Sequence, residues 1–374
     1  MVSGRKIPEN ISGDAEIAPA LANARDACLA EVGQPGSPEP ASALEGPAWR
    51  MPEELRPIYE PIQQEIAQVE QFLQAELRSR FPALDELMRY GFRLGGKRMR
   101  PALVLLSAKA IGPIRPEHIL VAAVVELIHT ATLVHDDVLD EATMRRHLLT
   151  INARWNTESS VLLGDYLFTH ALCLATRLED LSVYRVLAET TRTLCEGELR
   201  QVQQRGQYSL SEEEYLDIIW AKTAALCECA CGLGAYYAGA SPTEHQALRR
   251  YGSDLGVAFQ ITDDLLDLIG DEQRVGKSLG TDIAKQKITL PLIHLLRQLN
   301  DPERNRLIEL LGQPIQSSRP LLRRYCEQTD AALYTLQKAA EYIRRAKSHL
   351  ELVPPSPART ALEQLADFVL AREH

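Results

Sequence analysis

The sequence predicts an all-α protein, built as a single large helical bundle around a central cavity. Three observations support this fold class. From Trp49 onward, apolar residues recur at spacings of three and four, which is the period of one helix face. Glycine and proline residues separate these stretches from one another. The sequence contains no Asn-Gly hairpin signal and no run of alternating β-branched residues.

The predicted helices follow one another with short breaks between them. The first carries one apolar face, made of Ile58, Ile62, Ile66, Val69, Leu73 and Leu77. Further helices are predicted over 83–92, 101–111, 117–140, 160–178, 181–204, 212–238, 244–269, 287–298, 304–311, 329–350 and 358–371. The breaks contain Gly95-Gly96, Gly112-Pro113, Gly206, Ser241-Pro242, Gly270, Gly276, Gly280 and Pro354-Pro355.

The N-terminal segment differs from the rest in composition. Residues 1–48 contain no aromatic residue and are rich in proline, glycine, serine, alanine and glutamate. A segment of this kind cannot bury enough apolar surface to offset its ordering entropy. We therefore predict that residues 1–48 form a disordered extension and that residues 49–374 form one all-α domain.

Composition excludes several classes of protein. The 51 acidic and 41 basic side chains leave a net charge of −10, which argues against nucleic-acid binding. No apolar run approaches the roughly 20 residues that cross a bilayer. Seven irregularly spaced cysteines do not resemble a secreted disulfide framework, so we expect a cytoplasmic protein. Cys227, Cys229 and Cys231 lie among small apolar residues, and we expect them to pack in the core rather than bind a metal.

Two D-D-x-x-D clusters interrupt helices that are otherwise apolar. One contains Asp136, Asp137 and Asp140, and the other contains Asp263, Asp264 and Asp267. The first and last aspartates of each cluster lie about one helical turn apart, on nearly the same face. Carboxylates this close repel one another, and a hard divalent cation removes that cost. A solvated acidic face is the alternative, but the repetition of the cluster in apolar surroundings favours Mg²⁺ and, with it, a polyphosphate ligand.

Basic residues accompany both clusters. GGKRMRP places Lys97, Arg98 and Arg100 after a glycine pair, at a helix start fixed by Pro101. Others follow further along the chain: Arg145, Arg146, Lys222 with Thr223, Lys277 and Lys287. These residues predict two phosphate sites, one bridged by metal and one held by arginine and lysine alone. His129 lies about two turns before Asp136 on nearly the same face, so ligand contact is favoured over a core role.

The chain resembles the trans-isoprenyl diphosphate synthases, also called the polyprenyl synthetase family. It carries GGKRMRP, HDDVLDEATMRR, GDYL, GELRQ, KTAAL, FQITDDLLD and GKSLGTDIAKQKITLP in the order of that family, over about residues 50 to 374. It departs from the family pattern where His147 and Gln286 stand in place of the usual glycine. The resemblance implies the isoprenoid synthase fold and a prenyltransferase that joins an allylic diphosphate to isopentenyl diphosphate.

The resemblance also implies a role for each matching residue. Asp136, Asp140 and Asp263 would bind Mg²⁺, about three ions per active site, with Asp137, Asp264 and Asp267 supporting them. The allylic diphosphate would contact Arg145, Lys222, Thr223, Gln260, Lys277 and Lys287. Isopentenyl diphosphate would contact Lys97, Arg100, His129 and Arg146, with Arg98 in the same substrate-binding motif. The glycine-rich segment 270–287 is a candidate lid. Family members are usually homodimers, and a long apolar product implies at most peripheral membrane contact.

Product length depends on the floor of the cavity. In the family, bulky residues one or two turns before the first cluster stop elongation, and here these positions hold Ile128, Ala131 and Thr132. An open tunnel is therefore expected, which favours an all-trans product of geranylgeranyl length or longer. The alternatives are a short-chain farnesyl or geranylgeranyl synthase, a class I terpene cyclase, and a non-catalytic subunit of a heteromeric synthase. GGKRMRP and the six retained aspartates count against the last two.

Overall fold

The computed structural model describes residues 49–93, 96–270, 279–313 and 315–371, and these residues are almost entirely helical. The chain therefore has the all-α fold that the sequence predicts. The N-terminal half of the described chain contains η2 (Glu53–Leu55), α2 (Arg56–Tyr59), η3 (Glu60–Ile62), α3 (Gln63–Glu76), α4 (Pro82–Arg93), α5 (Met99–Ile111), α6 (Pro116–Leu139), α7 (Ile151–Arg154), α8 (Thr157–Thr176) and α9 (Leu181–Gln203). A short antiparallel ribbon, β1 (Met144–Arg145) and β2 (Leu148–Leu149), follows α6.

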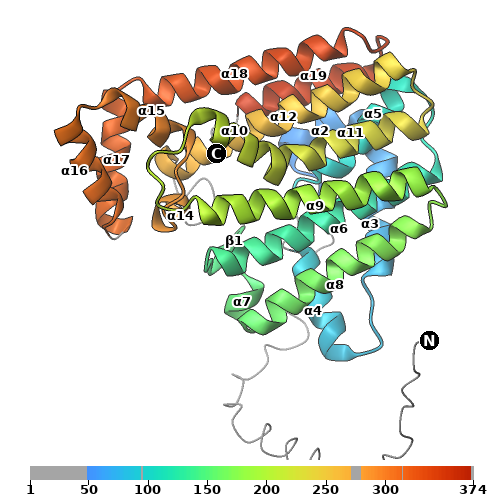
Figure 1. The fold of residues 1–374 in the computed structure, drawn as a ribbon. Coiled ribbons are helices and arrows are strands. Elements are labelled where there is room, and N and C mark those ends of the chain that lie inside the picture. Colours follow the sequence, from blue (N-terminus) through green and yellow to red (C-terminus); the bar gives the residue numbers. More distant parts are fainter. Residues whose placement is uncertain (1–48, 94–95, 271–278, 314, 372–374) are drawn as a thin grey trace, which may run out of the picture. The chain divides into compact units, whose positions relative to one another are not determined.

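The C-terminal half continues the bundle. It contains α10 (Glu212–Ile219), the π-helical turn η4 (Trp220–Ala224), α11 (Ala225–Tyr237), α12 (Pro242–Ile269), α14 (Thr281–Ala284), α15 (Leu290–Gln298), α16 (Asp301–Leu311), α17 (Ile315–Gln328), α18 (Ala331–Leu350) and α19 (Pro357–Leu370). Figure 1 shows the long helices lying side by side, with α15, α16 and α17 gathered at one end.

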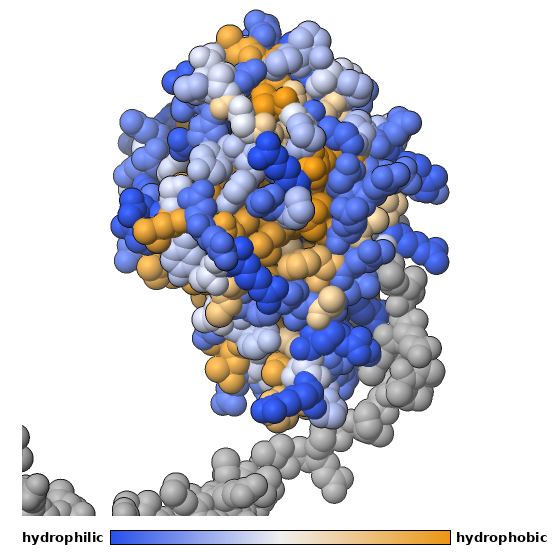
Figure 2. All heavy atoms as spheres, turned by 90° about the vertical axis from the view of Figure 1, so that its right-hand side faces the viewer, coloured by the Kyte–Doolittle hydropathy of each residue, from blue (hydrophilic) through white to orange (hydrophobic). Residues whose placement is uncertain are grey.

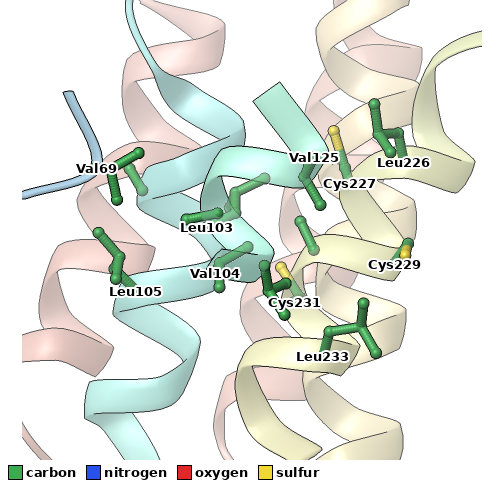
Figure 3. Packing of buried hydrophobic residues seen from close by; sticks show 14 of the residues in the cluster. Val69, Leu103, Val104, Leu105, Val125, Leu226, Cys227, Cys229, Cys231 and Leu233 are labelled. Carbon is green, nitrogen blue, oxygen red and sulfur yellow. The ribbon is translucent and has the colours of Figure 1, made fainter. Parts of the chain in front are cut away.

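The long helices bury one continuous apolar core. Helix α11 packs between α5 and α12, while α6 packs against α5 and α8. Figure 3 shows Val104 of α5 and Val125 of α6 near Cys231 and Cys227 of α11, whereas Cys229 points away from α5. Cys227, Cys229 and Cys231 are free thiols and are buried there, which confirms the predicted core packing. A second apolar cluster lies under α15, α16 and α17.

Most helix boundaries agree with the apolar periodicity, and the exceptions have local causes. The start of the predicted first helix is broken into α2 and η3 before α3 begins, because Pro57 and Pro61 interrupt the backbone hydrogen bonds. The predicted helix 212–238 is one continuous rod whose middle is the π-helical turn η4. Helix α17 was not predicted, and it contains Pro320.

Two helical stretches are long and apolar enough to cross a membrane. They are Pro116–Leu139 and Glu212–Tyr237, and 67% and 83% of their apolar windows are buried inside the protein. Both are therefore packed as core helices in this structure. On the face seen in Figure 2, hydrophilic side chains alternate with apolar patches.

A buried ion triad anchors the start of α5. Arg98 precedes α5 in left-handed backbone, with φ 53°. Its guanidinium bonds to the carboxylate of Glu70 on α3 and, at 2.8 Å, to that of Glu126 on α6. The ring of Phe92 lies 4.3 Å from it. The three charged side chains are almost fully buried, so each depends on the others for neutralisation.

Replacing Arg98 with Met should destabilise the protein by about 3–5 kcal/mol, because Glu70 and Glu126 would be left buried without a cation. Urea denaturation of the full chain measures this loss. Arg177→Met is the control: Arg177 pairs with Glu76 at the surface, and its loss should cost about 0–1 kcal/mol. Equal unfolding midpoints for Arg98→Met and the wild type would contradict the anchoring role.

Candidate active site

The two aspartate clusters meet at one end of the bundle. Asp136 and Asp137 lie in the last turns of α6, Asp140 is its C-cap, and the second cluster ends α12. Figure 1 shows these helix ends near β1 and α14. Arg145 links the clusters electrostatically: burial acts to lower its pKa, but Asp137, Asp136 and Asp263 outweigh that effect and raise it. The clusters predicted from sequence therefore share one site.

Each aspartate of the first cluster has a basic partner. Asp137 is buried and accepts a forked hydrogen bond from Arg145, at 2.8 and 2.9 Å. The ammonium of Lys222 lies 3.6 Å from Asp136, and that of Lys287 lies 2.9 Å from Asp140. Burial raises the pKa of Asp137, and the charge and hydrogen bond of Arg145 oppose that rise.

The second cluster is held mainly by neutral hydrogen bonds. Asp264 is buried and accepts from the hydroxyl of Tyr215 and from the amide of Gln260, both at 2.7 Å. Thr223 in turn donates to the Gln260 oxygen at 2.7 Å. Burial, and then the nearby charge of Asp282, raise the pKa of Asp264 to about 8. Asp264 is therefore largely protonated at neutral pH in the free protein.

Asp267 organises the segment that follows the second cluster. Its carboxylate accepts from the Thr281 hydroxyl at 3.2 Å and from the Asp282 amide at 3.0 Å, at the start of α14. Asp282 lies 3.4 Å from the ammonium of Lys287. Asp267 therefore sets the position of Lys287 opposite Asp140.

The π-helical turn η4 places Lys222 and Thr223. Helix α9 approaches this turn so closely that a Cβ on Gly197 would lie 2.6 Å from the Lys222 backbone nitrogen. This approach allows Glu198 and Gln201 to contact the Lys222 ammonium, at 2.5 and 2.9 Å. Burial acts to lower the pKa of Lys222, but Asp136 and Glu198 outweigh it and raise the pKa. Lys222 is therefore a charged, oriented ammonium.

The basic residues of GGKRMRP divide into two groups. Arg98 is buried in its ion triad, so its guanidinium is unavailable to a substrate, and the prediction that Arg98 binds substrate is corrected. Arg100 has a buried Nε without a hydrogen-bond partner among the described residues. Lys97 remains half exposed, 3.2 Å from Glu54. The conformation of the loop determines that the Arg98 side chain points into the core. The sequence pattern does not show this conformation.

Arg146 and His129 lie near the same basic group. A Cβ on Gly96 would lie 2.1 Å from Arg146 Nη2, so the absence of a side chain there leaves room for the guanidinium. Burial, and then the charge of Arg145, lower the pKa of Arg146 to about 10. Burial, Arg100 and Arg146 hold the pKa of His129 well below its usual range. His129 is therefore a neutral imidazole beside several cations, which suits a hydrogen bond to an anion.

The carboxylates fit a hard divalent cation by their chemistry. Asp136, Asp140 and Asp263 offer oxygen atoms only, which Mg²⁺ and Ca²⁺ prefer. As the side chains stand, no three of the described histidine, cysteine, aspartate or glutamate residues converge tightly enough to hold a metal ion. Asp136 and Asp140 instead contact Lys222 and Lys287. In this structure the positive charge beside these two carboxylates comes from ammonium groups.

Some predicted site residues cannot be placed, and others were not predicted. Lys277 and most of the glycine-rich part of the candidate lid lie outside the described residues. Several residues that contact the clusters or Lys222 were absent from the predicted set, among them Glu198, Gln201, Arg205, Tyr215 and Asp282. Glu198 and Gln201 lie in GELRQ, and Asp282 lies in GTDIAK. Their positions in these family motifs could have identified them as site residues. Tyr215 and Arg205 carry no such signal.

The predicted chain-length positions lie on α6. Ile128 and Ala131 are fully buried in the apolar core, whereas Thr132 is half-buried and donates to the His129 carbonyl at 2.7 Å. Tyr166 and Phe168 of α8 pack against the same core, and the Phe168 ring lies 5.8 Å from that of His135. Side chains of α6 and α8 therefore pack against one another on the side of α6 that carries these positions.

This chain resembles a protein-family model, several curated proteins and several solved structures. The polyprenyl synthetase family model matches residues 81–326. Octaprenyl diphosphate synthase of Escherichia coli is 37% identical over 85% of this chain and 99% of its own length. Nonaprenyl diphosphate synthase of Mycobacterium tuberculosis is 35% identical, over 82% and 92% respectively. The solved polyprenyl synthase of Caulobacter crescentus, complexed with calcium and isoprenyl diphosphate, is 34% identical with a TM-score of 0.81, over 86% of this chain and 98% of that one.

Replacing Asp264 with Asn should stabilise the metal-free protein increasingly as pH rises from about 4 to about 8. The unfolded carboxyl ionises near pH 4, while the folded one holds its proton to about pH 8. Wild-type stability therefore falls across this window, and the amide removes that fall. Thermal unfolding in chelator from pH 5 to 9 measures the difference. Asp217→Asn, at an exposed carboxylate of α10, is the control. If the difference in stability between Asp264→Asn and the wild type does not change with pH, the raised pKa of Asp264 is contradicted.

Proposed function

The chain belongs to the polyprenyl synthetase family, and on that premise we propose that it condenses an allylic prenyl diphosphate with isopentenyl diphosphate. The product is a longer all-trans polyprenyl diphosphate. The observation that carries this proposal is the convergence of two aspartate clusters at one end of an apolar bundle, with Lys222, Lys287 and Arg145 held against the first of them. The chain is a prenyltransferase of this family.

Several basic and polar side chains of the site are placed to contact the leaving diphosphate. Lys222 and Lys287 present ammonium groups to the diphosphate that leaves the allylic substrate, where negative charge develops. Arg145 is fixed by Asp137, and Thr223 and Gln260 form a hydrogen-bonded pair beside Lys222. Because these donors are oriented before substrate arrives, they need little reorganisation during the reaction.

The aspartates would hold divalent metal ions. We propose Mg²⁺, with Asp136, Asp140 and Asp263 as ligands, because their donor atoms are all carboxylate oxygens. When bound, the metal supplies positive charge that stabilises the leaving diphosphate. The calcium in the solved Caulobacter crescentus relative supports a divalent cation of this kind.

The second substrate would bind through the other basic group. Arg100 has an unpartnered buried nitrogen, and Arg146 and the neutral His129 lie near it. Together with Lys97 they form an anion site that needs no metal. Holding isopentenyl diphosphate here brings its double bond close to the allylic carbon, and the apolar core beneath keeps water away from the allylic cation.

The product is proposed to be long. Ala131 and Thr132 are small residues in the positions that floor the cavity, and octaprenyl and nonaprenyl synthases are among the relatives. A terpene cyclase is disfavoured because the chain carries GGKRMRP and two complete aspartate clusters.

We also propose a cytoplasmic homodimer that contacts membranes peripherally. The large apolar side chains exposed on α8 and α9, including Leu162 (67%), Leu181 (71%) and Leu199 (62%), support a surface that a second copy covers. A long apolar product supports the membrane contact.

Incubation with Mg²⁺, isopentenyl diphosphate and farnesyl diphosphate should yield longer prenyl diphosphates. Asp136→Ala and Asp263→Ala should each lower turnover by about 10²-fold or more, since each removes a group that stabilises developing charge. Asp217→Ala, an exposed acid on α10, is the matched control and should retain wild-type turnover. If labelled isopentenyl carbon enters no prenyl product with any allylic primer, the synthase assignment is wrong.

Filling the cavity floor should shorten the product. Ala131→Phe or Thr132→Phe adds a ring beneath the first cluster, and the extra volume blocks elongation. Chromatography of the dephosphorylated products measures chain length, and thermal midpoints confirm that each variant folds. Ile119→Phe, on the same helix about three turns earlier, is the control. An unchanged product from both folded variants would exclude a floor at these positions.

A further inference from the structure

A partly buried arginine beside the first aspartate cluster has unused hydrogen-bonding capacity. Arg205 lies in the turn that follows α9. Its Nε and Nη2 are both buried, and neither has a hydrogen-bond partner in the part of the chain that the structure describes. Nη2 lies 3.5 Å from Asp140 Oδ1, which is an ion-pair distance but too long for a good hydrogen bond. Buried donors are normally satisfied, so this fork points to a ligand.

The turn that carries Arg205 is fixed against the segment that carries Lys287. Gly206 has φ +73°, and its amide donates to the Gln286 carbonyl at 2.9 Å. Lys287, the next residue, contacts Asp140 at 2.9 Å. Arg205 and Lys287 therefore converge on one carboxylate from two different elements. Lys287 donates a hydrogen bond to Asp140 Oδ2, whereas Asp140 Oδ1 and the two buried Arg205 donors have no hydrogen-bond partner among the described residues.

We propose that Arg205 binds a phosphate oxygen of the allylic diphosphate, as a further substrate-binding residue beside Lys287. This inference rests on the proposed function. A planar guanidinium matches phosphate oxygens with two parallel donors, which an ammonium group cannot do. Asp140 holds the guanidinium at its edge, so that the remaining donors are oriented before the substrate arrives.

The surroundings select the allylic diphosphate over the second substrate. Arg205 contacts Asp140 in the first aspartate cluster, where the proposed metal ligands lie. The group proposed for isopentenyl diphosphate is organised by a different loop, in which Arg146 packs on Gly96. An effect of Arg205 should therefore appear with the allylic substrate alone.

A purely structural role for Arg205 predicts a different result. If the guanidinium served only as a counter-ion to Asp140, its removal would change the Mg²⁺ requirement and leave the diphosphate affinity unchanged. The two roles can be separated by measuring metal and diphosphate dependence independently.

The test compares Arg205→Gln with Arg200→Gln in the full chain. Arg200 lies on α9 and pairs with Asp217 at 3.9 Å at the surface, so it is a matched loss of charge. Calorimetry with inorganic pyrophosphate at saturating Mg²⁺ should show about tenfold or greater loss of affinity for Arg205→Gln. Steady-state kinetics should show a similar rise in KM for farnesyl diphosphate, with KM for isopentenyl diphosphate unchanged. Arg200→Gln should match the wild type, and Arg205→Lys should recover part of the loss.

Two outcomes would overturn the proposal. One is unchanged pyrophosphate affinity and unchanged KM for farnesyl diphosphate in Arg205→Gln; the other is a shift in the Mg²⁺ midpoint alone. Arg205→Lys provides the same comparison if Arg205→Gln fails to fold. The wild-type assay separates this inference from the proposed function. If the wild-type chain incorporates no isopentenyl carbon, the proposed function is wrong. If the wild-type chain is active and Arg205→Gln changes neither pyrophosphate affinity nor KM, only the proposed role of Arg205 is wrong.

Discussion

The arrangement of this protein depends on the neutralisation of carboxylates that lie close together at one end of an apolar bundle. Several acidic side chains of α6, α9, α12 and α14 are drawn out of bulk water there. An unpaired buried carboxylate would cost several kcal/mol. The chain meets this cost in two ways: the first cluster pairs with basic side chains, and Asp264 keeps its proton within neutral hydrogen bonds.

This requirement explains local structures that would otherwise look irregular. The π-helical turn η4 places Lys222 against Asp136 and Glu198. The β1–β2 ribbon brings Arg145 back onto Asp137 eight positions earlier. The same ribbon needs left-handed backbone at His147, and the turn before Lys287 needs it at Gln286, with φ of 62° and 53°. Family members usually place glycine at both positions, and left-handed backbone is the reason glycine suits them.

The sequence predicted the helices well because burial imposes a period on apolar residues, and it predicted both clusters because acids in an apolar helix need a special reason. The sequence was less informative about side-chain roles that depend on contacts between distant segments of the fold. Lys97, Arg98 and Arg100 look equivalent in GGKRMRP, yet only Arg98 faces Glu70 and Glu126 in the core. Arg205 follows a helix end in a polar stretch, and only the contact between Gly206 and Gln286 brings it to Asp140. Periodicity contains no information about such contacts between distant segments.

The local charge of the site, rather than the net charge of the chain, explains how an acidic protein could bind a diphosphate. The net charge of −10 belongs to the whole chain, and at about 10 Å salt already screens it. Within the site, Lys222, Arg145, Lys287 and Arg205 each lie against a carboxylate of the first cluster. Asp136 and Asp140 would hold the proposed metal ions, and Lys222 and Lys287, which contact these two carboxylates, would then be placed to contact phosphate oxygens. Because each of these carboxylates lies against a cation, the site avoids part of the desolvation penalty that an all-acidic pocket would incur.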